Sequence, residues 1–123
     1  MKAIKKSLNK NRKSYGYAWK GIRLASRGNN FRYQIMAAIA VITLGVFSSL
    51  KAWEWVAIIM MIGLVLVAET FNTALEVLVD QIYPDYHTVA GKVKDMAAGA
   101  VLLLAITSAA VALIIFLPKY INV

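Results

Sequence analysis

Three long apolar stretches follow one another along the chain. Residues 35–50 and 96–117 carry no charge at all, and residues 55–79 carry only two charged side chains, both glutamates. At a rise of 1.5 Å per residue, about 20 helical residues cross a hydrocarbon layer of about 30 Å. The first stretch reaches that length only if its helix begins near Phe31, with the charge of Arg32 at the interface. The pattern therefore predicts transmembrane helices at about 31–50, 53–79 and 96–117.

The composition excludes a water-soluble domain. Hydrophobic residues make up 60% of the 123 residues and charged residues 16%, against about 45–50% and 25% in soluble domains. A chain of this length has too little interior to hide that much apolar surface from water. With no cysteine, there is no disulfide or thiolate metal site. We therefore predict an all-α membrane protein in which residues 1–123 form a single domain.

The positive charges are concentrated before the first apolar stretch. Ten of the 14 lysines and arginines lie within the first 33 residues, and the first acidic residue is Glu54. Cytoplasmic segments of membrane proteins carry such an excess of Lys and Arg. The distribution therefore predicts a cytoplasmic N-terminus, and three spans then place the C-terminus on the external side.

Residues 1–30 combine a basic arm with the pattern of an amphipathic helix. Apolar side chains share one helical arc and basic side chains another; the apolar set is Tyr15, Ala18, Trp19, Ile22 and Ala25, and the basic set is Lys13, Lys20, Arg23 and Arg27. This pattern is typical of a helix that lies on a membrane surface. The alternative is a plain anchor with no part in any site. A nucleic-acid-binding arm would leave the acidic residues of the second apolar stretch unexplained, so we expect no nucleic-acid partner.

The second apolar stretch carries a polar stripe. Its members recur at intervals of three, four, seven and eleven residues, and so share one face of a helix: Glu69, Asn72, Thr73, Glu76 and Asp80. A charge near mid-bilayer costs about 2.5–3.5 kcal/mol on insertion scales, so such residues face protein or water and are candidates for function. From an entry near residue 54, Glu69 lies about 21–24 Å along the span and Glu76 about 10 Å further, among head groups.

This gradient of depth suggests a division of chemical roles. Glu69 is the most desolvated of the acids and suits general-base work. Glu76 and Asp80, nearer water, suit a hard divalent cation such as Mg²⁺, which takes oxygen ligands and keeps bound phosphates and waters. Asn72 lies one turn from both glutamates, and Lys94 lies across the turn where it can neutralise phosphate.

Two further roles would also account for an acidic stripe. The carboxylates could pair with Lys92, Lys94 or the basic arm and serve only to tie helices together. Alternatively, the stripe could conduct protons or cations through an oligomeric channel or transporter. The single histidine, His87, has no second histidine or cysteine with which to complete a zinc site.

The same residues carry a resemblance to a known family. Residues 68–80 read AETFNTALEVLVD, and residues 91–101 read GKVKDMAAGAV after the pair Tyr86-His87. These segments resemble the E-x-x-N-[ST]-[AS]-x-E-x-x-V-D signature and the following motif of the small integral-membrane diacylglycerol kinases, a family that includes the undecaprenol kinases of Gram-positive bacteria. Residues 17–23 and 30–32 match more weakly.

The resemblance implies a homotrimeric enzyme of the bacterial cytoplasmic membrane. It would transfer the γ-phosphate of MgATP to the hydroxyl of a membrane lipid, either undecaprenol or diacylglycerol. The implied catalytic residues are Glu69, Asn72, Lys94 and Asp95, and the implied metal ligands are Glu76 and Asp80. The implied nucleotide-binding residues are Tyr17, Glu76, Asp85, Tyr86, His87, Lys94 and Asp95. The implied lipid-binding residues are Trp19, Arg23, Phe31, Arg32, Glu69 and Ala98.

One departure from the family concerns the metal. Many members carry a second metal-binding glutamate just before the Asn-Phe-Arg element, but residues 27–32 here read RGNNFR, with Gly28 near the position and no acid anywhere before Glu54. We expect Asn29, Asp80, Asp95 or water to fill the position, or metal affinity and turnover to be lower. Residues 114–119 look like the Gram-positive branch, which favours undecaprenol slightly, but the sequence does not separate the two lipids.

Overall fold

The computed structural model describes residues 1–121 and contains four α-helices in that part of the chain. In order they are α1 (Lys2–Ala25), α2 (Asn29–Phe47), α3 (Ala52–Ile82) and α4 (Thr88–Tyr120). The last three are long and apolar enough to cross a membrane. The prediction of an all-α protein with three membrane-length helices is therefore confirmed.

The helices extend further than the apolar stretches that revealed them. α4 begins at Thr88, well before the span predicted from residue 96, and α3 continues to Ile82. α2, by contrast, ends at Phe47, so residues 48–50 lie in the following turn. Hydropathy marks only the part of a helix that suits lipid, whereas the backbone hydrogen bonds continue into polar sequence.

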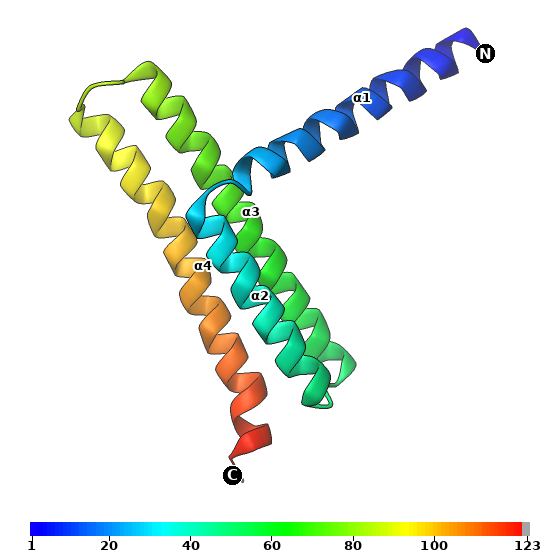
Figure 1. The fold of residues 1–123 in the computed structure, drawn as a ribbon, viewed down its shortest axis with the longest axis vertical. Coiled ribbons are helices and arrows are strands. Elements are labelled where there is room, and N and C mark those ends of the chain that lie inside the picture. The colour runs from blue at the N-terminus through cyan, green and yellow to red at the C-terminus, as the bar shows by residue number, and fades with distance from the viewer. Residues whose placement is uncertain (122–123) are drawn as a thin grey trace.

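The N-terminal segment is one continuous helix that includes the predicted basic arm. α1 leaves the other helices at a steep angle and points away from them (Figure 1). Of its residues only Ala25, at its end, is buried. Ala25 and Phe31 mark the junction between α1 and α2, which lies against the middle of α3.

α3 and α4 form a long antiparallel hairpin joined by residues 83–87, and its tip extends beyond the junction of α1 and α2 (Figure 1). Two ion pairs connect the helices near opposite ends. Lys94 Nζ lies 2.7 Å from Asp80 Oδ1 near the tip, and Lys119 Nζ lies 3.0 Å from Glu54 Oε2 at the other end. These two pairs fix which residues of α3 and α4 lie level with one another.

The end of the bundle opposite the tip is the more tightly connected one. Glu54 is buried, and its Oε2 also accepts a hydrogen bond of 2.7 Å from the backbone N–H of Lys51. Ser48 Oγ lies 2.7 Å from the Tyr120 hydroxyl, which joins the turn after α2 to the end of α4. The structure thus gives Glu54 and Lys119 a helix-tying role, which the sequence pattern does not indicate.

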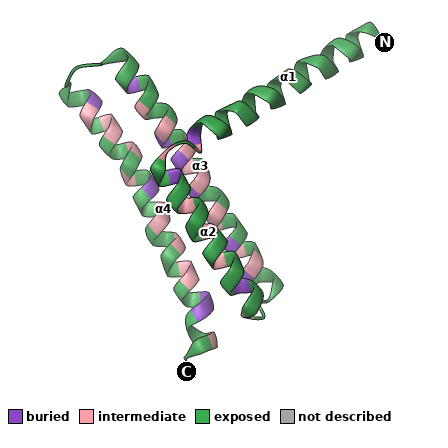
Figure 2. Cartoon of the chain, viewed as in Figure 1, coloured by how far each residue is buried: buried purple, intermediate pink, exposed green. Residues whose placement is uncertain are grey.

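The apolar core is small for a chain of this composition. Its centre is a cluster of Ile58, Ile115 and Phe116, and no side chain in residues 1–121 is completely buried. Buried segments are scattered along the bundle, and most of the apolar surface faces outward (Figure 2). Exposed apolar area on this scale indicates a surface covered by lipid or by other subunits.

Gly45 permits the closest approach between α2 and the start of α3. A Cβ at this position would lie 2.9 Å from both Leu50 Cδ1 and Trp55 Cη2, and 3.3 Å from Trp55 Cζ3. The indole ring is large and rigid, so it can relieve such a contact only by rotating about its side-chain bonds into space that its neighbours leave. The turn between the two helices also places Ser49 in the left-handed region, with φ 49°.

We predict that Gly45→Val lowers the stability of the fold. The added methyl groups would meet the Trp55 ring, and overpacking of this kind costs about 1–3 kcal/mol. The matched variant is Gly63→Val on α3, where a Cβ would meet nothing within 4 Å. Thermal unfolding in detergent should separate the two variants, and equal midpoints would contradict the packing described for Gly45.

Candidate active site

The acidic stripe of α3 is graded in burial. Glu69 is 3% exposed and Asn72 5%, whereas Glu76 is half-buried and Asp80 is exposed near the tip of the hairpin. The order of burial is the one that the spacing in the sequence predicts. The stripe therefore runs from the interior of the bundle to its polar end.

Glu69 has the most unusual environment of these residues. Within residues 1–121, its carboxylate has neither a hydrogen bond nor an ion pair. Its backbone carbonyl oxygen accepts a hydrogen bond of 2.9 Å from the hydroxyl of Thr73. A buried carboxylate without a partner is costly. A carboxylate left in this state is available to accept a proton from a group brought to it.

Asn72 orients the next carboxylate along the stripe. Its Nδ2 donates a hydrogen bond of 3.1 Å to Glu76 Oε1, while its own Oδ1 is buried without a partner in residues 1–121. The second oxygen of Glu76 is not used by this bond. Asn72 and Glu76 thus present two free oxygen atoms, one from the amide and one from the carboxylate, and oxygen ligands of this kind suit a hard cation.

Only one carboxylate of the stripe forms an ion pair within residues 1–121. Asp80 accepts from Lys94 across the hairpin at 2.7 Å, and both side chains are substantially exposed. Glu69 and Glu76 have no basic partner within the same residues. An ion pair between helices therefore explains the presence of Asp80 in the stripe, but not that of Glu69 and Glu76.

A polar hollow of about 330 Å³ lies at the tip of the hairpin. Its lining includes two small residues of α4, Ala90 and Gly91. The hollow brings together five of the seven residues predicted to bind a nucleotide, together with Asp80: Asp85, Tyr86, His87, Lys94 and Asp95. It therefore presents positive, negative and aromatic groups near the polar end of the stripe.

His87 has a structural role within this hollow. It is the N-cap of α4, and its Nδ1 accepts a hydrogen bond of 3.3 Å from the backbone N–H of Ala90. Its ring lies against that of Tyr83, with 4.4 Å between the ring centroids. Capping satisfies one of the free N–H groups that begin a helix, so His87 fixes the direction in which α4 leaves the turn.

The remaining predicted residues are not gathered in the same place by this chain alone. Tyr17, Trp19 and Arg23 lie on α1 and are exposed. Phe31 is buried at the start of α2, whereas Arg32 beside it is exposed, and Ala98 is exposed on α4. Tyr17 does not line the hollow at the hairpin tip.

The donor set for a metal ion is incomplete without a ligand. Residues 1–121 contain no group of three histidine, cysteine, aspartate or glutamate side chains close enough to hold an ion. Glu76 and Asp80 nevertheless offer hard oxygen atoms near the polar hollow. Because Mg²⁺ is usually bound by one or two carboxylates together with phosphates and water, this donor set fits an ion that arrives with a nucleotide.

Comparison with known proteins places the chain in one family. Residues 16–116 match the prokaryotic diacylglycerol kinase family. The chain is 41% identical over 113 residues to the undecaprenol kinase of Bacillus subtilis, covering 91% of this chain and 92% of that protein. It is 35% identical over 92 residues to the diacylglycerol kinase of Escherichia coli K12, covering 74% and 75%.

A third relative is the diacylglycerol kinase of Synechocystis, 38% identical over 111 residues, or 89% of this chain and 63% of that protein. These relatives are all named as kinases, and none supports the channel or transporter alternative. The match covers the acidic stripe, the hairpin tip and most of α4. The chain is a member of the prokaryotic diacylglycerol kinase family.

Proposed function

We propose that this membrane lipid kinase transfers the γ-phosphate of MgATP to the hydroxyl of undecaprenol or diacylglycerol. The observation that carries the proposal is the buried Glu69 carboxylate, which has no partner within residues 1–121. It lies on the face of α3 that leads to the polar hollow at the hairpin tip. A lipid hydroxyl reaching Glu69 from the membrane could thus meet a phosphate that enters from the hollow.

In this reaction Glu69 acts as the general base. Its carboxylate accepts the proton of the lipid hydroxyl while that oxygen forms a bond to the γ-phosphorus of ATP. The bond between the γ-phosphorus and its bridging oxygen breaks, and ADP leaves with the electron pair. Phosphoryl transfer needs positioning and charge stabilisation more than covalent chemistry by the protein, so a base and a few charged groups suffice.

The nucleotide would bind at the hairpin tip. Lys94 is placed to neutralise phosphate oxygens, and its ion pair with Asp80 would be exchanged for a phosphate when ATP enters. Asp95, Asp85 and Tyr86 line the same hollow and would contact the nucleotide. His87 would contribute chiefly by capping α4. Tyr17 would contribute from α1.

Magnesium would enter with ATP and bind Glu76, with Asp80 as a further oxygen ligand. When bound, the ion would supply positive charge to the phosphate oxygens. Asn72 supports this role because its amide N–H fixes the Glu76 carboxylate. The lack of an acid near Gly28 leaves a position for Asn29, Asp95 or water, and implies weaker metal binding than in family members that carry the second glutamate.

The lipid would contact residues of α1, α2 and α4 that are exposed to the surroundings of the bundle. These residues are Trp19 and Arg23 of α1, Arg32 of α2 and Ala98 of α4. We further propose a homotrimer in the bacterial cytoplasmic membrane, with the N-terminus cytoplasmic and the C-terminus external. The large exposed apolar surface supports the membrane setting and the assembly, and the concentration of Lys and Arg in the first 33 residues supports a cytoplasmic N-terminus. The projection of α1 away from the hairpin tip (Figure 1) leaves Tyr17 free to contribute to the site of a neighbouring subunit.

We predict that Glu69→Gln lowers the turnover number by at least about 100-fold. The amide is nearly isosteric but cannot accept the proton, and general-base catalysis typically contributes a factor of about 10²–10⁴. Initial rates with labelled ATP and solubilised lipid measure the loss. The matched control is Glu54→Gln, the same change in a buried acid at the far end of α3, which should retain turnover per folded molecule. Full activity of Glu69→Gln would remove the base assignment.

A second prediction concerns the metal. Glu76→Gln should raise the Mg²⁺ concentration for half-maximal activity at least about 10-fold, because one charged oxygen ligand is lost. Titration of activity with Mg²⁺ at fixed total ATP measures this shift, and Glu54→Gln should keep the wild-type requirement. An unchanged Mg²⁺ dependence in Glu76→Gln would show that Glu76 does not bind the ion.

A further inference from the structure

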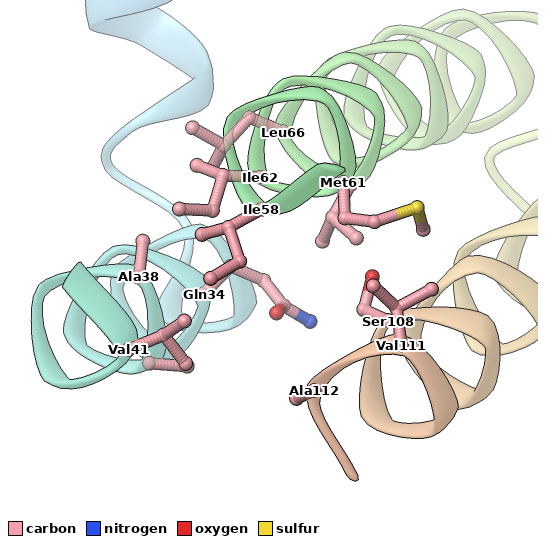
Figure 3. A pocket seen from close by; sticks show the side chains of 12 residues that line it. Gln34, Ala38, Val41, Ile58, Met61, Ile62, Leu66, Ser108, Val111 and Ala112 are labelled. Carbon is pink, nitrogen blue, oxygen red and sulfur yellow. The ribbon is translucent and has the colours of Figure 1, made fainter. Parts of the chain in front are cut away.

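An apolar pocket lies between α2, α3 and α4 (Figure 3). Its α3 residues lie between Ile58 and Leu66, on the side of Glu69 away from the hairpin tip. Aliphatic side chains form most of its wall, among them Val41, Ile58, Ile62 and Val65. Its lining ends at Leu66, three residues before Glu69 on the same helix. The pocket therefore begins one helical turn from the proposed base.

Two polar side chains interrupt this apolar wall. Gln34 extends from α2 into the pocket, and Ser108 faces the same space from α4 (Figure 3). Ser108 Oγ is buried and has no hydrogen-bond partner within residues 1–121. A buried hydroxyl without a partner is costly, and a ligand with a hydrogen-bonding atom at this point would satisfy it.

The register of the helices places both polar groups at one level. The helices α3 and α4 are antiparallel, and the ion pairs Asp80–Lys94 and Glu54–Lys119 show which of their residues are level. Counting along both helices from these pairs places Ser108 level with Leu66. The helices α2 and α3 are also antiparallel, and the ring of Trp55 lies against Gly45. Counting along both helices from this contact places Gln34 level with Leu66. Leu66 is three residues from Glu69, and three helical residues rise about 4.5 Å. Gln34 and Ser108 therefore lie about 4.5 Å from Glu69 along the helix axis, on the side away from the hairpin tip.

The two candidate lipid alcohols differ at this depth. A diacylglycerol carries an ester carbonyl close to its free hydroxyl, whereas a polyprenol continues as hydrocarbon. An ester carbonyl only accepts hydrogen bonds, and the Gln34 amide and the Ser108 hydroxyl both have N–H or O–H groups to donate. A lipid whose hydroxyl contacts Glu69 would place its first ester near these donors.

We propose that Gln34 and Ser108 bind an ester carbonyl of a glycerolipid alcohol, and so determine how well the enzyme uses diacylglycerol relative to a polyprenol. The inference rests on the proposed function, because it assumes that the lipid hydroxyl reaches Glu69. A site that hydrogen-bonds a substrate group discriminates against an analogue that lacks it. The pair would thus be specificity-determining residues of the lipid site and would leave phosphoryl transfer itself to Glu69.

The test compares three lipids in mixed micelles: dioleoylglycerol, its diether analogue without carbonyl groups, and undecaprenol. The quantity measured is the ratio of kcat/KM for the ester to that for the ether. In Ser108→Ala and in Gln34→Leu this ratio should fall roughly 3- to 10-fold, as expected for one hydrogen bond. The ratio of ester to undecaprenol should fall in the same direction.

Thr107→Ala is the matched control on α4. Thr107 is exposed, and its hydroxyl already donates to the carbonyl oxygen of Leu103 at 2.8 Å, so the ester-to-ether ratio should stay at the wild-type value. An unchanged ratio in active Ser108→Ala or Gln34→Leu enzyme overturns this inference while the proposed function stands. Wild-type protein that phosphorylates none of the three lipids overturns the proposed function itself.

Discussion

A carboxylate that is buried in a membrane-length helix without an internal partner is the constraint on which the rest of the structure depends. Glu69 is 3% exposed, and residues 1–121 offer its carboxylate neither a hydrogen bond nor an ion pair. Such a group is costly to bury, and helix packing alone would be better served by an apolar residue at this position. The carboxylate lies at the point where the apolar pocket ends and the polar stripe begins, which is where the proposed reaction would bring a lipid alcohol and a phosphate donor together.

Ion pairs near the two ends of the α3–α4 hairpin fix the register of the helices around Glu69. The Glu54–Lys119 pair fixes the far end, where Glu54 also accepts from the Lys51 backbone, and the Asp80–Lys94 pair joins the helices near the tip. The two pairs differ in character, because the first is largely buried and the second is exposed. An exposed ion pair contributes little to stability, so Lys94 can exchange its partner for a phosphate at small cost. The rigid end thus supports the register of the bundle, and the open end can rearrange around a nucleotide.

The sequence predicts the fold class and the stripe because both depend on local periodicity. The apolar stretches indicate the three long helices, and the spacing from Glu69 to Asp80 places those side chains on one face whatever surrounds it. Residues that become neighbours only through the packing of separate helices could not be found in this way. Gln34 and Ser108 are ordinary polar residues in apolar sequence, and Lys119 is one lysine near the C-terminus; their partners follow from the register of α2, α3 and α4. The helix bounds also differ from the predicted spans, since hydropathy does not mark where backbone hydrogen bonding stops. Tyr17, the predicted nucleotide-binding residue of α1, does not line the hollow at the hairpin tip, and no local pattern in the sequence indicates this separation.

The most direct measurement of the central claim follows labelled phosphate. The purified protein is mixed with γ-³²P-ATP, Mg²⁺ and a bacterial lipid extract in detergent, and the label in the organic phase is counted over time. If Glu69 brings a lipid alcohol and a nucleotide together, label should enter the organic phase in a form that α-³²P-ATP does not produce. Label that stays entirely in the aqueous phase, from protein shown to be folded, would contradict the account.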